Sequence, residues 1–553
     1  MGRVGSFGEH FARRRRLPET LDSLELGWDA LVARVPGLRR LDLSEMPLCS
    51  PHTVKVVEAA TKFCRELEAL ILPGKEHHEM RPGVEVDPLL DAVYKGLESW
   101  KPMGHRAGLR QLKVPTINEA ARYQSCRKFF HKVATLCPQV EYLDGYKQSL
   151  SEMDKLTCQD AWLLNLEDWR KFNKACTNIR EFNWVVAPFA DPYFELFGEY
   201  AKPQLTKLVL CINMLWDWGR YFFELDKEAG MLARTNIINY REGYGVFARH
   251  PSTALLGCPG LQELEIALYH PLSEDELDDP FAENTDPRYF PDEEVLDKNI
   301  FCDQFWETLA TSCPLVKRIT LWEIVEGLEQ QHIHTFTDHG LIALAQLKYL
   351  DFMELRPINC TGNGLFEFLN GFSDEFTGQR TFQICVGGKS IMPELKRTDL
   401  DFYDAALNLL TRIADTPAND LRMSQQRIVL RLRNAITSSV ERAWGVDYLD
   451  RIKTLVARVK ETHLSLRLRI TARGYSGKSF RSIIELGLYA AHADPSCWFG
   501  WDNEENNRDT VFVNREGEPN PDEGSEAVSR DDDDGDSDSE YDMDHGNDDD
   551  EAL

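Results

Sequence analysis

The chain has 553 residues, of which 42% are hydrophobic, so it can bury a sizeable core. It contains no run of about 18 apolar residues and begins without the apolar core of a signal peptide, so we predict neither a membrane-spanning helix nor a secretory leader. Its thirteen cysteines are an odd number, and five of them occupy the same place in a repeated pattern, which favours buried thiols in a reducing intracellular compartment, the cytoplasm, the nucleus or both.

The net charge of −28 is unevenly distributed. Residues 503–553 contain 21 acidic and 3 basic side chains and are predicted to be a disordered acidic tail. Residues 422–481 contain 14 basic and 4 acidic side chains. Residues 1–17 are predicted to be a disordered basic N-terminus, in which Arg13–Arg16 fits either a nuclear import signal or a solvated basic patch.

A short pattern, h-x-x-h-x-h with h apolar, recurs along the chain. The copy at 261–266 follows Cys258-Pro259, and four other copies also follow a cysteine. Alternating apolar residues that recur in this way predict a stacked array of short parallel strands. The copies begin at Leu38, Leu67, Leu109, Val140, Ile179, Leu205, Leu261, Val316 and Leu347.

The segments between the copies have helical spacing of apolar residues, as in 54–63, 117–136 and 305–312. Each unit is therefore predicted to be a helix, a turn, a short strand and a return loop. We predict an irregular repeat array over 18–390, with insertions at 217–257 and 273–298 that are either binding loops or tolerated additions.

One copy carries a family resemblance. Thr337-Asp338-His339-Gly340-Leu341 is followed by L-x-x-L-x-F from Leu347. This stretch resembles the acidic-x-Gly-Leu helix start and L-x-x-L-x-L strand of the cysteine-containing leucine-rich repeats found in F-box/leucine-rich-repeat proteins, and the resemblance covers residues 20–390. An F-box itself is matched only at its start, by Leu17-Pro18-Glu19.

The resemblance implies an α/β leucine-rich-repeat solenoid with a curved parallel sheet inside and helices outside. It also implies a possible role as the F-box-like substrate-recognition part of an SCF-type ubiquitin ligase, with a cullin adaptor as a partner.

Residues 391–502 are predicted to be a basic C-terminal cap of the array or a small α/β domain. Strands are predicted at 428–430 and 464–470, and helices at 400–414 and 480–491. The basic side chains of 422–481 can bind phosphate groups or pair with the acidic tail, and tethering within one chain favours the pairing. The tail offers Ser537 and Ser539 in an acidic setting that suits phosphorylation.

No catalytic, metal or cofactor motif is complete in the sequence. Residues 387–390 end like a phosphate-binding loop, but Gln383 stands where its first glycine belongs. His77 and His78 are adjacent and would point apart, and the histidines of 332–339 lack the spacing of a metal site. We therefore predict a protein that is not an enzyme and needs no cofactor.

The side chains between the apolar positions should project from the inner face of the sheet. They include aromatic residues and charges of both signs, which suits a protein partner and argues against nucleic acid. We predict a protein–protein interaction scaffold; the alternative is a nuclear or chromatin-associated protein whose acidic tail binds basic partners. The predicted contact residues are Arg40, Asp42, Gln111, Lys113, Tyr142, Glu181, Lys207, Glu263, Glu265, Arg318, Thr320, Trp322, Tyr349 and Asp351.

Overall fold

The computed structural model divides at residue 510 into two units, and all described residues lie in the first. These are residues 27–46, 50–73, 87–113, 131–144, 166–184, 191–213, 250–269, 300–324, 333–373, 376–386, 400–434, 441–463, 465–474, 480–487 and 498–501. The predicted N-terminal segment 1–17, the insertion at 273–298 and the tail at 503–553 lie outside them, as does 217–249.

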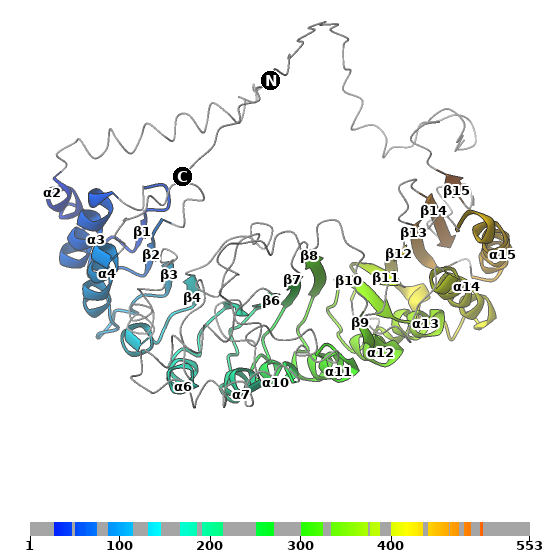
Figure 1. The fold of residues 1–553 in the computed structure, drawn as a ribbon, viewed down its shortest axis with the longest axis horizontal. Coiled ribbons are helices and arrows are strands. Elements are labelled where there is room, and N and C mark those ends of the chain that lie inside the picture. Colours follow the sequence, from blue (N-terminus) through cyan, green and yellow to red (C-terminus); the bar gives the residue numbers. More distant parts are fainter. Residues whose placement is uncertain are drawn as a thin grey trace, which may run out of the picture. The chain divides into compact units, whose positions relative to one another are not determined.

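The strands of the first unit form one sheet in which neighbours in sequence are neighbours in space (Figure 1). The ladder is parallel from β1 to β13, β14 and β15 add antiparallel strands, and β9 pairs only with β10. The strands are β1 (Arg40–Asp42), β2 (Ala69–Ile71), β3 (Gln111–Lys113), β4 (Tyr142–Asp144), β5 (Glu181–Asn183), β6 (Lys207–Asn213), β7 (Glu263–Tyr269), β8 (Arg318–Ile324), β9 (Ile333–Thr337), β10 (Phe352–Asn359), β11 (Gln379–Val386), β12 (Arg427–Asn434), β13 (Arg467–Gly474), β14 (Phe480–Gly487) and β15 (Trp498–Trp501).

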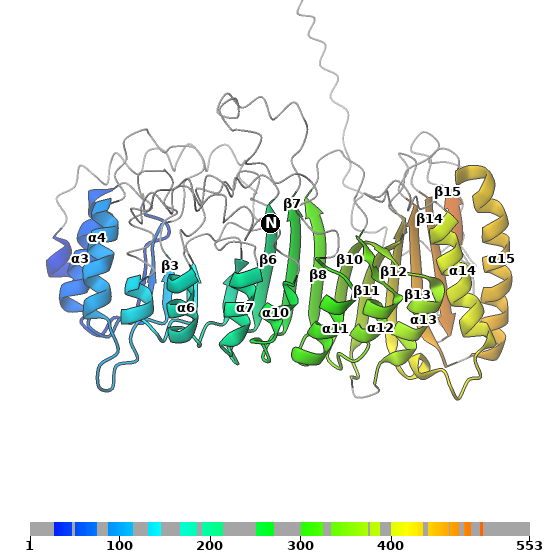
Figure 2. The same cartoon turned by 60° about the horizontal axis from the view of Figure 1, so that its bottom comes forward.

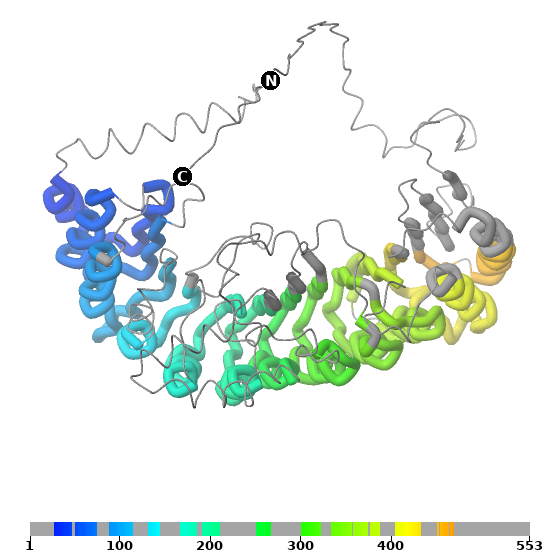
Figure 3. The backbone as a smooth tube through the Cα atoms, viewed as in Figure 1, coloured from blue at the N-terminus to red at the C-terminus, as the bar shows by residue number. Residues whose placement is uncertain are grey.

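The helices line the outer side of this row of strands (Figure 2), and Figure 3 traces the same backbone. They are α2 (Trp28–Val32), α3 (Pro51–Phe63), α4 (Asp87–Ser99), α6 (Leu166–Ala175), α7 (Asp191–Glu199), α10 (Ser252–Leu255), α11 (Asp303–Ser312), α12 (Asp338–Leu344), α13 (Gly362–Gly371), α14 (Leu400–Asp415) and α15 (Glu441–Thr462), with the 3-10 helix η8 (Arg422–Gln425). The predicted α/β leucine-rich-repeat solenoid is confirmed.

The core is a stack of apolar rows between the sheet and the helices. Leu264 in β7 pairs in register with Leu208 on one side and Ile319 on the other, and all three are buried. The strand register shows that one copy of the repeat pattern was placed wrongly. Met353 pairs with Ile319, so Leu347 is the residue of its repeat that corresponds to Cys313 in the preceding one. The strand copy is therefore Leu350/Met353/Leu355, three residues later than the sequence pattern predicted.

The cysteines that precede the strands form a second buried row. We call Cys64, Cys137, Cys176, Cys258 and Cys313 the cysteine row; all five are buried free thiols. Cys64 and Cys313 are the C-cap residues of α3 and α11, and Cys258 Sγ donates to the carbonyl of Ala254 at 3.2 Å. A thiol suits this position because it is small, apolar and a weak donor to a helix carbonyl.

Aspartates at helix starts join neighbouring repeats. The Asp303 carboxylate, at the start of α11, accepts bonds from Thr337 N (2.7 Å), Thr337 Oγ1 (2.6 Å) and Gly340 N (2.9 Å). Asp338 at the start of α12 accepts from the N (2.7 Å) and Oγ1 (2.6 Å) of Thr361. A Cβ on Gly340 would lie 2.7 Å from Asp303 Oδ1, so glycine is needed there. The aspartate and the glycine of the acidic-x-Gly-Leu motif thus form hydrogen bonds with neighbouring repeats.

Asp303→Ala should lower the free energy of unfolding by about 2–4 kcal/mol, because it leaves three donors at the start of α12 without their charged acceptor. Urea unfolding measures this loss. Glu307→Ala, one turn later on the exposed face of α11, is the matched control and should change stability by less than about 0.5 kcal/mol. Equal effects of the two changes would contradict the role of Asp303.

The C-terminal part contains one wrong prediction and several accurate ones. The helix expected at 400–414 is α14, and the strands expected at 428–430 and 464–470 are β12 and β13, the latter beginning at Arg467. The helix predicted at 480–491 is wrong: 480–487 is β14, paired along its length with β13. The unpaired edge of β13 offers a row of backbone donors and acceptors, and β14 satisfies them.

The sheet also crosses the predicted boundary at 390, because β11 and β12 pair over eight residues. The division of the chain into a repeat array over 18–390 and a C-terminal part over 391–502 therefore remains a prediction, which is based on how regular the sequence pattern is. Within the predicted insertion 217–257, residues 252–255 form α10, a regular helix of the array.

Candidate protein-binding surface

The face of the sheet that lies opposite the helices, which we call the inner face, carries two rows of in-register residues. The first row is Arg40, Ala69, Gln111, Tyr142, Glu181, Lys207, Glu263, Arg318, Phe352, Thr381 and Val429. The second contains Asp42, Ile71, Lys113 and Asp144, and further along Asn183, Val209, Glu265, Thr320, Glu354, Gln383 and Arg431.

The structure brings eleven of the predicted contact residues together in these two rows. Trp322 lies on β8, two residues beyond Thr320, and is in register with Ala267. Tyr349 and Asp351 do not lie on a strand; they belong to the turn before β10, because the repeat begins three residues later than the pattern indicated. The strand positions in that repeat belong to Phe352 and Glu354.

Sequence reasoning also missed the continuation of the rows into β11 and β12. Thr381, Gln383, Val429 and Arg431 extend them. Their copies were hidden because the first apolar position of the pattern is polar in both repeats, Gln379 in one and Arg427 in the other. Counting back from the buried pairs 382/384 and 430/432 would have found them.

At the N-terminal end of the inner face, polar side chains contact one another. Arg40 donates to Gln111 Oε1 at 3.0 Å and pairs with Asp42 at 3.1 Å, so it links β1 to β3. Bonds from Ser44 hold the pKa of Asp42 below its usual value. This end is therefore polar and balanced in charge.

The middle of the inner face is acidic. Glu181, Glu263 and Glu265 lie on β5 and β7 and are half-buried. Lys207 on β6, between them, pairs with Glu265 at 3.2 Å. With one lysine among three carboxylates, this zone presents a net negative charge to a partner.

The C-terminal end of the inner face is basic and partly aromatic. The Arg318 guanidinium lies 4.6 Å from the centre of the Phe352 ring. Gln383 donates to the Glu354 carboxylate. Beyond them, Arg431 is exposed on β12, and Arg427 of β12 stands in register with Arg467 of β13.

A buried arginine fixes the turn that carries Tyr349 and Asp351. Arg380 is fully buried, donates to Gln426 Oε1 at 2.9 Å and to the carbonyl of Lys348 at 3.0 Å, and also bonds the carbonyl of Leu350. Burial lowers the pKa of its guanidinium to about 10 and raises the pKa of Asp351. Through these bonds, Arg380 orders the backbone of the turn.

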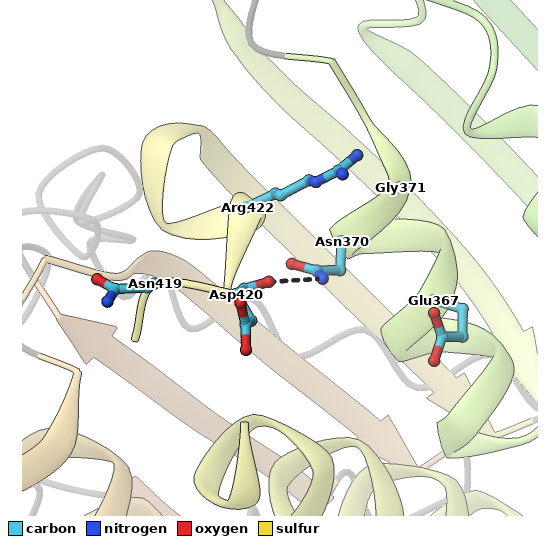
Figure 4. Close-up of a pocket in the computed structure, with 6 residues that line it drawn as sticks. All are labelled: Glu367, Asn370, Gly371, Asn419, Asp420 and Arg422. Carbon is cyan, nitrogen blue, oxygen red and sulfur yellow. Dashed lines mark hydrogen bonds between the residues drawn. The ribbon is translucent and has the colours of Figure 1, made fainter. Parts of the chain in front are cut away.

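One shallow polar pocket of about 430 Å³ lies on the helical side, between α13 and η8 (Figure 4). Asn370 lines this pocket. Its side-chain Nδ2 donates to the carbonyl of Asp420 at 3.2 Å, and its Oδ1 accepts from Met423 N at 3.2 Å. Glu367 pairs with Arg412 at 2.6 Å. These polar groups are engaged in these hydrogen bonds and this ion pair, and they form no acid–base or nucleophilic pair.

Metal-binding clusters are absent from the described residues: no three His, Cys, Asp or Glu side chains converge there. Within the described residues, no helix has the length and apolarity needed to cross a bilayer.

Comparison with known proteins adds little to this geometry. No protein-family model matches the chain, and no curated protein matches it. Among solved structures, the crystal structure of the Rad7 and Elc1 complex from yeast shows 12% sequence identity, covers 84% of this chain and 92% of that one, and has a TM-score of 0.25. The fold assignment therefore rests on the parallel ladder and repeats of this chain.

Proposed function

We propose that the chain is a protein–protein interaction scaffold that recognises its partner through the inner face. The observation that carries this proposal is the pair of in-register rows on a continuous backbone ladder. Side chains of varied chemistry in these rows are exposed or half-buried, while Ile71, Val209 and Gln383 are buried. Such a rigid surface loses little conformational freedom on binding, which favours affinity.

The distribution of charge supports a polar protein partner. The face changes from balanced, through acidic, to basic along the array, so a partner with the opposite order of charges gains complementary contacts in one orientation. A nucleic acid would meet Glu181, Glu263 and Glu265 in the middle of the surface and be repelled there.

Reversing two charges on this face should remove the partner. We expect the variant with Glu263→Arg and Arg318→Glu to lose proteins that co-purify with the wild-type chain, with recovery at least about tenfold lower, because each reversal places like charges against the partner. Affinity purification from the native cells with quantitative mass spectrometry measures the recovery.

The matched control reverses two charges on exposed helix residues, Lys55→Glu in α3 and Glu307→Arg in α11. It has the same net charge as the wild type, like the test variant, and should recover the same proteins as the wild type. Equal recovery with all three chains would overturn the inner face as the recognition surface.

A finer function, substrate recognition for an SCF-type ubiquitin ligase, rests on the resemblance of residues 20–390 to F-box/leucine-rich-repeat proteins. Its test is the same purification: a cullin and its adaptor should be recovered with the wild type and with the inner-face variant, because adaptor binding would use another part of the chain. Their absence from all samples would overturn this function.

The alternative, a nuclear or chromatin-associated protein, rests on the acidic composition of 503–553. Histones bound by the full chain and lost on removal of 503–553 would support it. Histones bound equally by the shortened chain would contradict a role for the tail.

A further inference from the structure

The apolar core of the array is open at its N-terminal end, where α2 and β1 form the first described repeat (Figure 1). Leu38 and Leu41 occupy core positions of this repeat, yet they are only half-buried. Their counterparts in the next repeat, Leu67 and Leu70, are buried because a further repeat packs on each side of them. The terminal repeat of a soluble array needs a polar outer surface, whereas this one ends in leucines.

Two exposed apolar side chains enlarge this open end. Leu31 of α2 is 56% exposed, and Val35, which follows the helix, is 48% exposed. We call Leu31, Val35, Leu38 and Leu41 the end face. Apolar side chains that gather at one place on a surface, instead of being scattered singly, mark a contact with another molecule.

The backbone of β1 is open on the same side. β1 is the first strand of the sheet and pairs only with β2 among the described strands. Arg39 O accepts a hydrogen bond from β2 at 2.9 Å, and Leu43 N donates one to β2 at 2.7 Å. Because successive residues of a strand direct their backbone groups to opposite sides, the N–H and C=O groups of Arg40 and Asp42 point away from β2.

The charges of β1 select one way in which this edge can pair with itself. When two copies of β1 lie antiparallel with Leu41 opposite Leu41, Arg40 of each copy stands opposite Asp42 of the other, with Cα atoms about 5.5 Å apart. The outward N–H and C=O groups of these residues then form hydrogen bonds between the copies. A register centred on Arg40 or on Asp42 would instead bring two like charges together.

We propose that the chain forms a two-fold symmetric dimer in which the β1 strands pair antiparallel about Leu41 and the two end faces pack against each other. The occupant is a second copy because the strand edge, the apolar residues and the charges are each self-complementary, as a two-fold interface requires. The axis of such a strand pair is perpendicular to the sheet, so the two inner faces lie on the same side of one continuous sheet. This inference goes beyond the proposed function and does not depend on it.

The residues before α2 are the alternative occupant of this edge. Residues 21–26 have the L-x-x-L-x-L spacing of a repeat strand, but only Gly27 separates them from α2. The short connection from Leu355 of β10 to the start of α13 at Gly362 is longer by several residues. Two residues span at most about 7 Å, which is too short a connection to lead from a strand beside β1 into α2.

Sedimentation velocity of the full-length chain measures the association over about 1–100 µM, where a small interface dissociates. The mass should rise from 63.5 kDa towards twice that value. Arg40→Asp and Asp42→Arg each turn both cross-chain pairs into like charges, so each variant alone should associate at least about tenfold more weakly. A wild-type chain that stays monomeric would overturn the inference, and slow hydrogen exchange at Arg40 and Asp42 in that monomer would assign the edge to the chain's own N-terminal residues.

The two charge variants together test the register. In an equimolar mixture, opposite charges meet again at both pairs, so a mixed dimer should form about as tightly as the wild-type dimer. The chain that carries both substitutions has its two charges exchanged and should dimerise as well. Misfolded variants would not recover on mixing, so this measurement separates folding from association. A mixture that stays monomeric, or dimers formed equally by every variant, would overturn the antiparallel pairing of β1.

A matched pair of substitutions tests the end face. Leu31→Lys places a charge in the apolar contact and should weaken the dimer about tenfold or more. Leu256→Lys makes the same change at a leucine that is 61% exposed in a different repeat, and it should dimerise like the wild type. Equal dimerisation of these two variants would overturn the end face as part of the interface. The Glu263/Arg318 reversal should dimerise normally, so failure of this inference and failure of the proposed function are distinguishable.

Discussion

Leu264→Asp is expected to unfold the central repeats and to lower the melting temperature by at least about 10 °C. Leu264 is 1% exposed and packs in the apolar row of β7, between Leu208 and Ile319. The change removes a buried leucine, worth about 2–5 kcal/mol, and adds a carboxylate that has no partner in the core. Because each repeat contacts only its neighbours, the damage should stay local at first.

Two measurements resolve this effect. Differential scanning calorimetry should show a lower or divided transition, and hydrogen exchange should show faster exchange in β6, β7 and β8 than in β1 or β12. Leu256→Asp makes the same substitution at a leucine that is 61% exposed, in the same repeat, and should shift the melting temperature by only a few degrees. A melting curve for Leu264→Asp like that of the wild type would contradict the buried position.

The architecture was predictable from sequence because two signals coincide. The apolar pattern marks the strands, and a cysteine six residues before the core residue of β7, as in Cys258 and Leu264, marks where the helix ends. Where both occur, the predicted repeat matches the structure. Where the cysteine is replaced, as by Leu347, the pattern could begin at either of two leucines, and the prediction chose the wrong one.

The remaining errors also have physical causes. Residues 480–487 place Phe480 and Ile484 at helical spacing, yet Phe480, Ser482, Ile484 and Leu486 also alternate; only the open edge of β13 decides for a strand. The hydrogen bond that Thr337 donates to Asp303 joins residues far apart in sequence, and no local sequence pattern predicts it.

The location of the candidate surface was predictable from the sequence, but the predicted set of residues was incomplete. Residues between apolar positions were correctly placed on the strands from β1 to β8. Pairing of the basic strands β12 and β13, which places Arg427 beside Arg467, depends on register and could not be read from composition alone.

The buried thiols should make the fold sensitive to alkali. Burial raises the pKa of Cys137, Cys176 and Cys258 to about 12, and the pKa values of Cys64 and Cys313 are also raised. In the unfolded chain a thiol ionises near pH 8.5. Between these values the folded state binds more protons than the unfolded state, so stability falls as pH rises, by about 1.4 kcal/mol per pH unit for each fully buried thiol.

A buried lysine opposes this trend. Lys202 is fully buried, and its ammonium donates to the carbonyls of Phe197 at 2.7 Å and Tyr200 at 2.8 Å. Burial lowers its pKa to about 8, whereas an unfolded lysine titrates near pH 10.4. Between those values the unfolded state binds more protons, so this one group adds stability as pH rises. Several thiols outweigh one lysine, and the net slope is negative.

We therefore expect the melting temperature, measured in the presence of a reductant, to fall steeply between about pH 9 and pH 10.5. Cys258→Ala removes one titrating thiol and should make this fall shallower, although the substitution lowers stability at pH 7. Cys302→Ala, at a half-buried cysteine outside the cysteine row, should keep the wild-type slope. A melting temperature that stays constant over this range, or identical slopes for Cys258→Ala and the wild type, would show that the thiols ionise as easily in the folded chain as in the unfolded one.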